Sequence, residues 1–142
     1  MLLVDVNVFL YAHRPESARH DEYRTWLSAA LTGAEPFGVS ELVLSAFLRI
    51  ATHSRIYREP TPVEVALAFC RSVVEAPSAV RVRPGPDHWH LFTQLVADGG
   101  ARGNLVPDAY LAALAIEHGA TWVTTDRGFA RYPLLRWTSP LS

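Results

Sequence analysis

The chain contains no lysine, a single cysteine and no long apolar run, and each of these shortages excludes a class of protein. All 13 cationic side chains are arginines, so the chain cannot form a phosphate-binding P-loop, whose lysine contacts the phosphates. Cys70 alone can form neither an intrachain disulfide bond nor a zinc site built on pairs of cysteines. Because no apolar run approaches the roughly 20 residues that span a bilayer, we expect no membrane partner.

The charge balance and the first residues of the chain exclude little more. A formal net charge of −1 gives no indication of a nucleic-acid partner by itself. The first residues lack a cationic segment followed by an apolar stretch and a cleavage site of small residues, so we expect no signal peptide and a cytoplasmic location. Two interpretations of the arginine-only composition stay open. One is a GC-rich coding bias, and the other is that guanidinium groups suit phosphate oxygens.

Short apolar strands alternate with longer helices along the chain. The residue pattern predicts strands at 2–6, 36–40, 79–85, 121–126 and close to 134–139. It predicts helices at 8–13, 20–31, 41–53, 62–75, 86–100 and 104–120. This order implies an α/β fold, a parallel sheet with helices on both faces. No repeat, low-complexity tract or linker interrupts it, so we expect residues 1–142 to form one domain.

Four acidic residues fall at positions that such a fold brings to one edge. Asp5 lies in the apolar stretch LLVDVNVFL, close to the end of the first strand, and Glu41 directly follows the second strand. Asp108 stands beside Pro107 in the first turn of its helix, and Asp126 terminates the strand TWVTT. Ligand sites of open parallel sheets lie beyond the C-terminal ends of the strands. We therefore expect these four carboxylates to line one site.

The chemistry of such a site follows from its charge. Carboxylates within a few ångströms of one another repel, and some take up protons unless a cation lies between them. Mg²⁺ and Mn²⁺ prefer oxygen ligands and usually keep several water molecules. An ion of this kind activates water and stabilises an in-line displacement at phosphorus. The four acids together therefore predict a metal-dependent phosphodiesterase.

Taken singly, three of the acids have an ordinary structural explanation. Glu41 and Asp108 could each complement the positive end of a helix, an effect worth about 0.3–1 kcal/mol. Asp126 could be a turn residue ahead of Arg127 and Gly128. Asp5 is the exception, because an acid within a strand has neither a cap nor a turn to serve. The coincidence of all four favours a site.

Three segments resemble a known family over essentially the whole chain. LLVDVNVFLYAH, LVLSAFLRIATHSRIY and RGNLVPDAYLAALAIEHGATWVTTDRGFARYPLLRW together resemble PIN-domain ribonucleases of the VapC toxin type. The resemblance implies a PIN-like three-layer α/β/α sandwich that cleaves RNA with Mg²⁺ or Mn²⁺. It implies metal-binding roles for Asp5 and Asp108, with Asp126 supporting a second metal position or a water. It also implies a homodimer and a cognate VapB-like antitoxin that blocks the mouth of the active site.

One position departs from the pattern of the family. Many such toxins carry a glutamate further inside the helix after the second strand, where this chain has Ser45 and Ala46. Glu41 lies about one helical turn earlier, and residues four apart share a helix face. Two hypotheses for Glu41 stay open: it reaches the metal, directly or through water, or it serves only the end of the helix.

Two other functions compete with the nuclease. The opening LLVDVNVF is also similar to the first motif of haloacid-dehalogenase-like phosphatases, but that chemistry needs a second acid where this chain has Asn7. It also needs a lysine to steady the phosphoaspartate, and the missing lysine argues against it, as it does against a receiver domain. The remaining alternative is a catalytically inactive PIN-fold module whose acids serve a protein-binding surface.

Overall fold

The computed structural model describes residues 1–141, which form a five-stranded sheet in the order β3-β2-β1-β4-β5. Every neighbouring pair of strands is parallel. The strands are β1 (Leu2–Val4), β2 (Phe37–Val39), β3 (Ala79–Arg81), β4 (Thr121–Val123) and β5 (Trp137–Thr138). Each of the five predicted strands is present, and each is shorter than the sequence pattern suggested.

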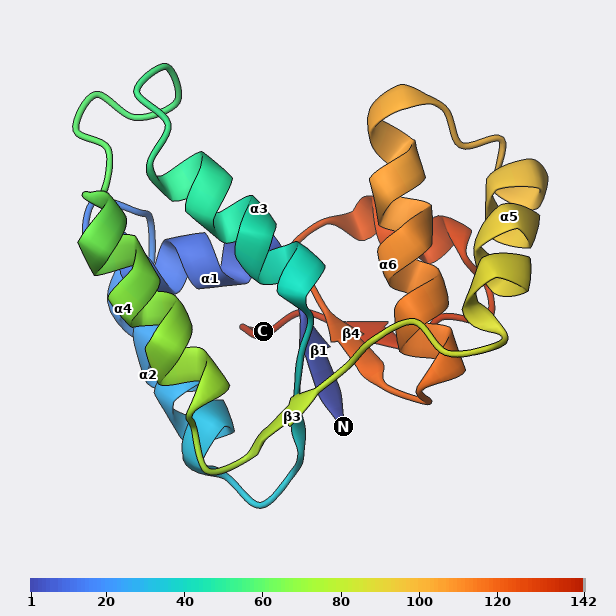
Figure 1. Ribbon diagram of the computed structural model, residues 1–142, viewed down its shortest axis with the longest axis horizontal. Coiled ribbons are helices and arrows are strands. Elements are labelled where there is room, and N and C mark those ends of the chain that lie inside the picture. Colours follow the sequence, from blue (N-terminus) through green and yellow to red (C-terminus); the bar gives the residue numbers. More distant parts are fainter. Residues whose placement is uncertain (142) are drawn as a thin grey trace.

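Six α-helices cover the sheet in two layers. They are α1 (Val6–His13), α2 (His20–Thr32), α3 (Glu41–Ala51), α4 (Val63–Val74), α5 (His88–Gly99) and α6 (Val106–Glu117). Two short 3₁₀ helices, η1 (Gly103–Leu105) and η2 (Arg127–Arg131), precede α6 and follow β4. Figure 1 shows α1 to α4 on one side of the strands and α5 and α6 on the other. The predicted three-layer α/β/α architecture is confirmed.

The order of the strands fixes where a ligand can bind. From β1 the chain adds β2 and then β3 on one side of the sheet. After α5 and α6 it returns to the other side of β1, where β4 pairs with β1. The direction of winding therefore reverses between β1 and β4. Open α/β sheets bind their ligands in the crevice beyond the strand ends at this reversal. The residues that follow β1 and β4 are Asp5 and Thr124.

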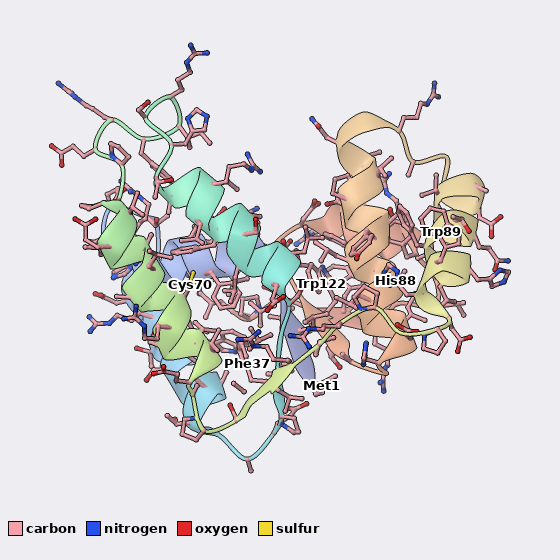
Figure 2. All side chains as sticks on the ribbon, viewed as in Figure 1. Met1, Phe37, Cys70, His88, Trp89 and Trp122 are labelled. Carbon is pink, nitrogen blue, oxygen red and sulfur yellow. The ribbon has the colours of Figure 1, made fainter. Side chains whose placement is uncertain are left out.

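Both faces of the sheet bury aromatic side chains, so the strand ends rest on a packed core. The ring of Phe37 on β2 contacts Phe9 of α1, and the ring of Trp122 on β4 contacts Phe129 of η2. Phe37 and Trp122 are wholly buried and lie in the middle of the molecule (Figure 2). Burial of large side chains stabilises the fold by about 1.5–3 kcal/mol each. The short strands are held by this packing as much as by their few ladder bonds.

The α5–α6 hairpin is tied together at its open end by a buried histidine. His88, at the first position of α5, lies between the two helices (Figure 2), and its Nε2 is 3.0 Å from the carbonyl oxygen of Tyr110. The side chain of Glu117 accepts hydrogen bonds from the backbone amides of Gly85 and Asp87. These contacts orient α6 and, with it, the acid in its first turn.

All six helices differ from their predicted bounds by one to three residues at one or both ends. The first helix begins at Val6 rather than Val8, directly after Asp5, and the third ends at Ala51 rather than His53. No helix within residues 1–141 is long and apolar enough to cross a membrane.

Candidate active site

Asp5 is the buried centre of the candidate site. It follows β1, keeps only 7% of its surface exposed, and its backbone amide donates to the carbonyl oxygen of Val123 on β4. Its Oδ1 accepts from the amide of Val6 at 2.7 Å, so Asp5 is the N-cap of α1. The expectation that this acid has no cap to serve is therefore wrong. The helix starts one residue after it, and a capping carboxylate stabilises a helix by about 0.5–2 kcal/mol.

Thr124 fixes the second oxygen of Asp5. Its hydroxyl donates to Asp5 Oδ2 at 2.7 Å and accepts from the backbone amide of Asp126 at 3.0 Å. The Thr124 side chain is wholly buried. A chain of hydrogen bonds thus runs from Asp126 through Thr124 to Asp5 and joins the ends of β4 and β1. Sequence reasoning missed Thr124, although its place in TTD directly after the strand was the available signal.

Asp126 follows β4 and is exposed to solvent. It is the N-cap of η2, and its Oδ1 accepts from the amide of Gly128 at 2.7 Å. The turn role weighed from the sequence is therefore present. It does not remove the charge of Asp126 from the site, because that charge acts on both Asp5 and Asp108.

Asp108 completes the group from the first turn of α6. Burial, followed by the negative charges of Asp5 and Asp126, raises the pKa of Asp108 to about 6, and nearby Arg131 opposes the shift. Burial also raises the pKa of Asp5 against the hydrogen bonds from Thr124 and Val6. Both carboxylates therefore favour their protonated forms more than free carboxyl groups do. Burial is the larger cause in both cases, and the neighbouring negative charges add to it, which a cation between the carboxylates would oppose.

Glu41 stands apart from these three acids. Its carboxylate pairs with Arg81 at the end of β3 and lies 3.7 Å from the guanidinium of Arg83. The Glu41 side chain is 61% exposed, and its charge is not among the causes that shift the pKa values of Asp5 and Asp108. The structure thus brings together Asp5, Asp108 and Asp126 and turns Glu41 toward two arginines.

The oxygen atoms of these carboxylates suit a hard divalent cation, but they do not surround one. The available groups are carboxylate oxygens, without a thiolate or an imidazole among them, which is the chemistry that Mg²⁺ and Mn²⁺ prefer. Within residues 1–141 no three His, Cys, Asp or Glu side chains are placed so that together they could hold a metal ion. An ion at this site would rest on one or two carboxylates and water, the usual manner of Mg²⁺ binding.

A comparison with protein families decides the relationship of the chain. The model of the PIN domain matches residues 2–135, and the match spans all the acids described above. The chain belongs to the PIN domain family. It is 46% identical over 141 residues to VapC ribonuclease Mb2897 of Mycobacterium bovis, covering 99% of this chain and 96% of that protein. It is 41% identical over 140 residues to ribonuclease VapC31 of Mycobacterium tuberculosis, covering 99% of each.

Two solved structures of low sequence identity share the fold. VapBC2 from Rickettsia felis, solved bound to a DNA fragment from its promoter, superposes with a TM-score of 0.69 at 20% identity, covering 97% of each chain. Mycobacterium tuberculosis VapC20, described as a sarcin-ricin loop cleaving toxin, superposes with a TM-score of 0.68 at 14% identity, covering 92% of this chain and 93% of that one. At these identities the likeness establishes the α/β/α fold alone.

Proposed function

We propose that this PIN protein is a metal-dependent endoribonuclease and the toxin of a toxin–antitoxin pair. The observation that carries the proposal is the meeting of Asp5 and Asp108 at the winding reversal of the sheet, where the pKa of Asp108 rises to about 6. The curated relatives that are named ribonucleases support cleavage of RNA. The VapBC complex among the structural neighbours supports a VapB-like antitoxin as partner. A homodimer stays a prediction.

The role of each acid follows from its surroundings. Asp5 and Asp108 would hold a Mg²⁺ or Mn²⁺ ion between them, and the positive charge would offset the burial and the repulsion that raise their pKa values. Asp126 is exposed and caps the 3₁₀ helix η2. It would orient a water molecule or support a second ion rather than bind the first one. The ion, when bound, supplies a water activated for attack at phosphorus.

The residues around the acids prepare the site for this chemistry. Both oxygens of Asp5 already accept a hydrogen bond, so the carboxylate is held in one orientation and each oxygen keeps a free lone pair. Preorganised ligands reduce the reorganisation that metal binding requires. Arg131, beside Asp108, would contact an oxygen of the RNA backbone.

Cleavage assays with matched charge variants test the proposal. Single-stranded RNA is incubated with the wild type and with the variants Asp5→Asn and Asp108→Asn, in Mg²⁺, in Mn²⁺ and in a chelator. We expect cleavage by the wild type in either metal and none in the chelator. Both variants should lose at least about 100-fold, because each removes a charge that holds the ion.

The control is Asp21→Asn, which removes an exposed acid from the first turn of α2. It should cleave like the wild type. Retained cleavage in Asp5→Asn and Asp108→Asn would overturn the proposed site. A wild type that cleaves nothing but binds its antitoxin would favour the alternative of an inactive PIN-fold binding module.

A further inference from the structure

A cavity outside the candidate site lies between α5, α6 and the segment that follows η2. Its volume is about 340 Å³, within the roughly 300–1,000 Å³ typical of small-ligand pockets. Its walls are mainly apolar, with Leu91 and Leu95 from α5, Ile116 from α6 and Leu134 from the chain after η2. None of the acids assigned to the candidate site lines it.

Gln94, Asp98 and Arg131 add polar groups to this wall, and Tyr132 adds a buried one. Its ring lines the wall and is 98% buried, and its hydroxyl has no hydrogen-bond partner among residues 1–141. Unpaired buried hydroxyl groups are rare in native proteins, because each loses its hydrogen bonds to water and gains none in the folded state. The group is therefore suited to a partner that enters the cavity. Because the hydroxyl is closed to solvent, a partner reaches it only when a neighbouring group of the cavity wall moves aside.

Arg131 connects the cavity to the catalytic acids. It lines the cavity wall, and its positive charge acts on Asp108, lowering the pKa that burial raises. The charge of Asp108 also acts on Tyr132. A molecule seated in the cavity thus lies next to Arg131. In the proposed function, Arg131 contacts an oxygen of the RNA backbone, so the molecule is a neighbour of that phosphodiester.

We propose that this cavity is a subsite for one unpaired nucleobase adjacent to the cleaved phosphodiester, an inference that rests on the proposed function. Proteins that bind single-stranded RNA splay bases out, pack their faces against side chains and hydrogen-bond their edges. The leucine walls supply the apolar contact, and Tyr132 supplies the edge contact. An apolar side chain of a protein partner fits less well, because it would leave the Tyr132 hydroxyl unpaired.

Two substitutions test the subsite without touching an acid. Tyr132→Phe removes only the unpaired hydroxyl. Gly99→Leu fills the cavity, because a Cβ at Gly99 lies 3.6 Å from Tyr132 Cε1 and meets nothing closer. The matched controls are Gly99→Ala, which leaves the cavity open, and Tyr11→Phe, which removes a hydroxyl on α1, remote from the cavity.

The first readout is base preference at the cut. A single-stranded RNA library with randomised positions is cleaved and its ends are sequenced. The wild type and both controls should prefer particular bases at one flanking position, by about five- to hundredfold. Tyr132→Phe and Gly99→Leu should reduce the preference at that position to about twofold. An unchanged preference in both variants overturns the subsite and leaves the proposed function intact.

The second readout does not depend on cleavage. Oligonucleotides that carry fluorescent 2-aminopurine at each position in turn are titrated into Asp5→Asn, which keeps the cavity. A fluorescence change at one position that is lost when Gly99→Leu is added supports the subsite. This result holds even if the wild type cleaves no RNA, because absent cleavage overturns the proposed function and leaves the subsite standing. Equal signals with and without Gly99→Leu overturn the subsite.

Discussion

The hydroxyl of Thr124 donates a hydrogen bond to Asp5 Oδ2 across 2.7 Å, although 119 residues separate the two in the sequence. This bond joins the ends of β1 and β4, the two strands between which the winding of the sheet reverses. The same hydroxyl accepts from the amide of Asp126. One buried side chain therefore sets the position of one acid and the backbone of another.

Thr124→Val is expected to weaken cleavage while preserving the shape of the core. Valine fills the same volume but leaves Asp5 Oδ2 without its donor and the Asp126 amide without its acceptor. Loss of a group that orients a metal ligand typically costs 10- to 100-fold, and we expect a fall of about that size. The free energy of unfolding should fall by about 1–3 kcal/mol. Cleavage rates and urea denaturation measure the two effects.

Thr124→Ser is the matched control, because it retains the hydroxyl. It should keep cleavage within about threefold of the wild type, apart from a small loss of packing. A valine variant that cleaves as fast as the wild type would show that the hydrogen bond does not serve the reaction.

The raised pKa of Asp108 predicts an unusual pH dependence of stability in metal-free protein. The folded state binds a proton to Asp108 below about pH 6, whereas the unfolded chain does so only below the ordinary value of 3.8. Folding therefore takes up a proton between these values, and stability rises as pH falls through this window. Above pH 6 the carboxylate is charged in both states, and its burial destabilises the fold. We expect this cost to be about 1–2 kcal/mol, because Asp108 keeps partial access to water.

Asp108→Asn isolates this contribution. In a chelator at pH 7.5 the variant should unfold at a higher temperature than the wild type, and the difference should shrink toward pH 4. Saturating Mg²⁺ should stabilise the wild type and leave the variant nearly unchanged, because binding to the folded state alone raises stability. A difference that is constant across the pH range would contradict the assigned pKa shift.

Much of this fold follows from local patterns. The apolar strands alternate with amphipathic helices, and this alternation predicted the parallel sheet and its two layers of helices. Asp5 and Asp126 were found from sequence because strand ends share one edge of such a sheet, whatever the details of packing. Asp108 was found because the segment VPD begins a helix.

The remaining features depend on contacts between distant segments. No local pattern reports that the Thr124 hydroxyl meets Asp5. The partners of Glu41 depend on the pairing of β2 with β3, whose register sets Val39 beside Arg81 and so brings Arg81 to the start of α3. The capping role of Asp5 was missed because α1 begins without a loop after β1. Such junctions are the least predictable part of a sequence.

Glu41→Gln is expected to cleave within about threefold of the wild type. The carboxylate is exposed and paired with arginines, so its removal should change the free energy of unfolding by no more than about 1 kcal/mol. Asp126→Asn also removes one negative charge, but from the group formed by Asp5, Asp108 and Asp126. It should therefore weaken metal-dependent cleavage more strongly than Glu41→Gln does. Cleavage rates over a Mn²⁺ titration measure both. An equal loss in the two variants would place Glu41 in the metal site, as one of the two sequence-based hypotheses holds.

Gly38→Ala tests whether the close approach of β2 to its neighbours holds the sheet together. A Cβ at Gly38 would lie 2.9 Å from the carbonyl oxygen of Leu2 and 2.9 Å from Val82 Cγ2, closer than real side chains come. The first of these atoms is backbone, so the strain cannot be relieved by rotating a side chain. We expect the free energy of unfolding to fall by about 1–3 kcal/mol, measured by urea denaturation.

The matched control is Gly99→Ala, whose Cβ meets nothing closer than 3.6 Å and which should be neutral or stabilising. Equal stability of Gly38→Ala and the wild type would show that the sheet accommodates the extra methyl group and that the close approach at Gly38 does not limit stability.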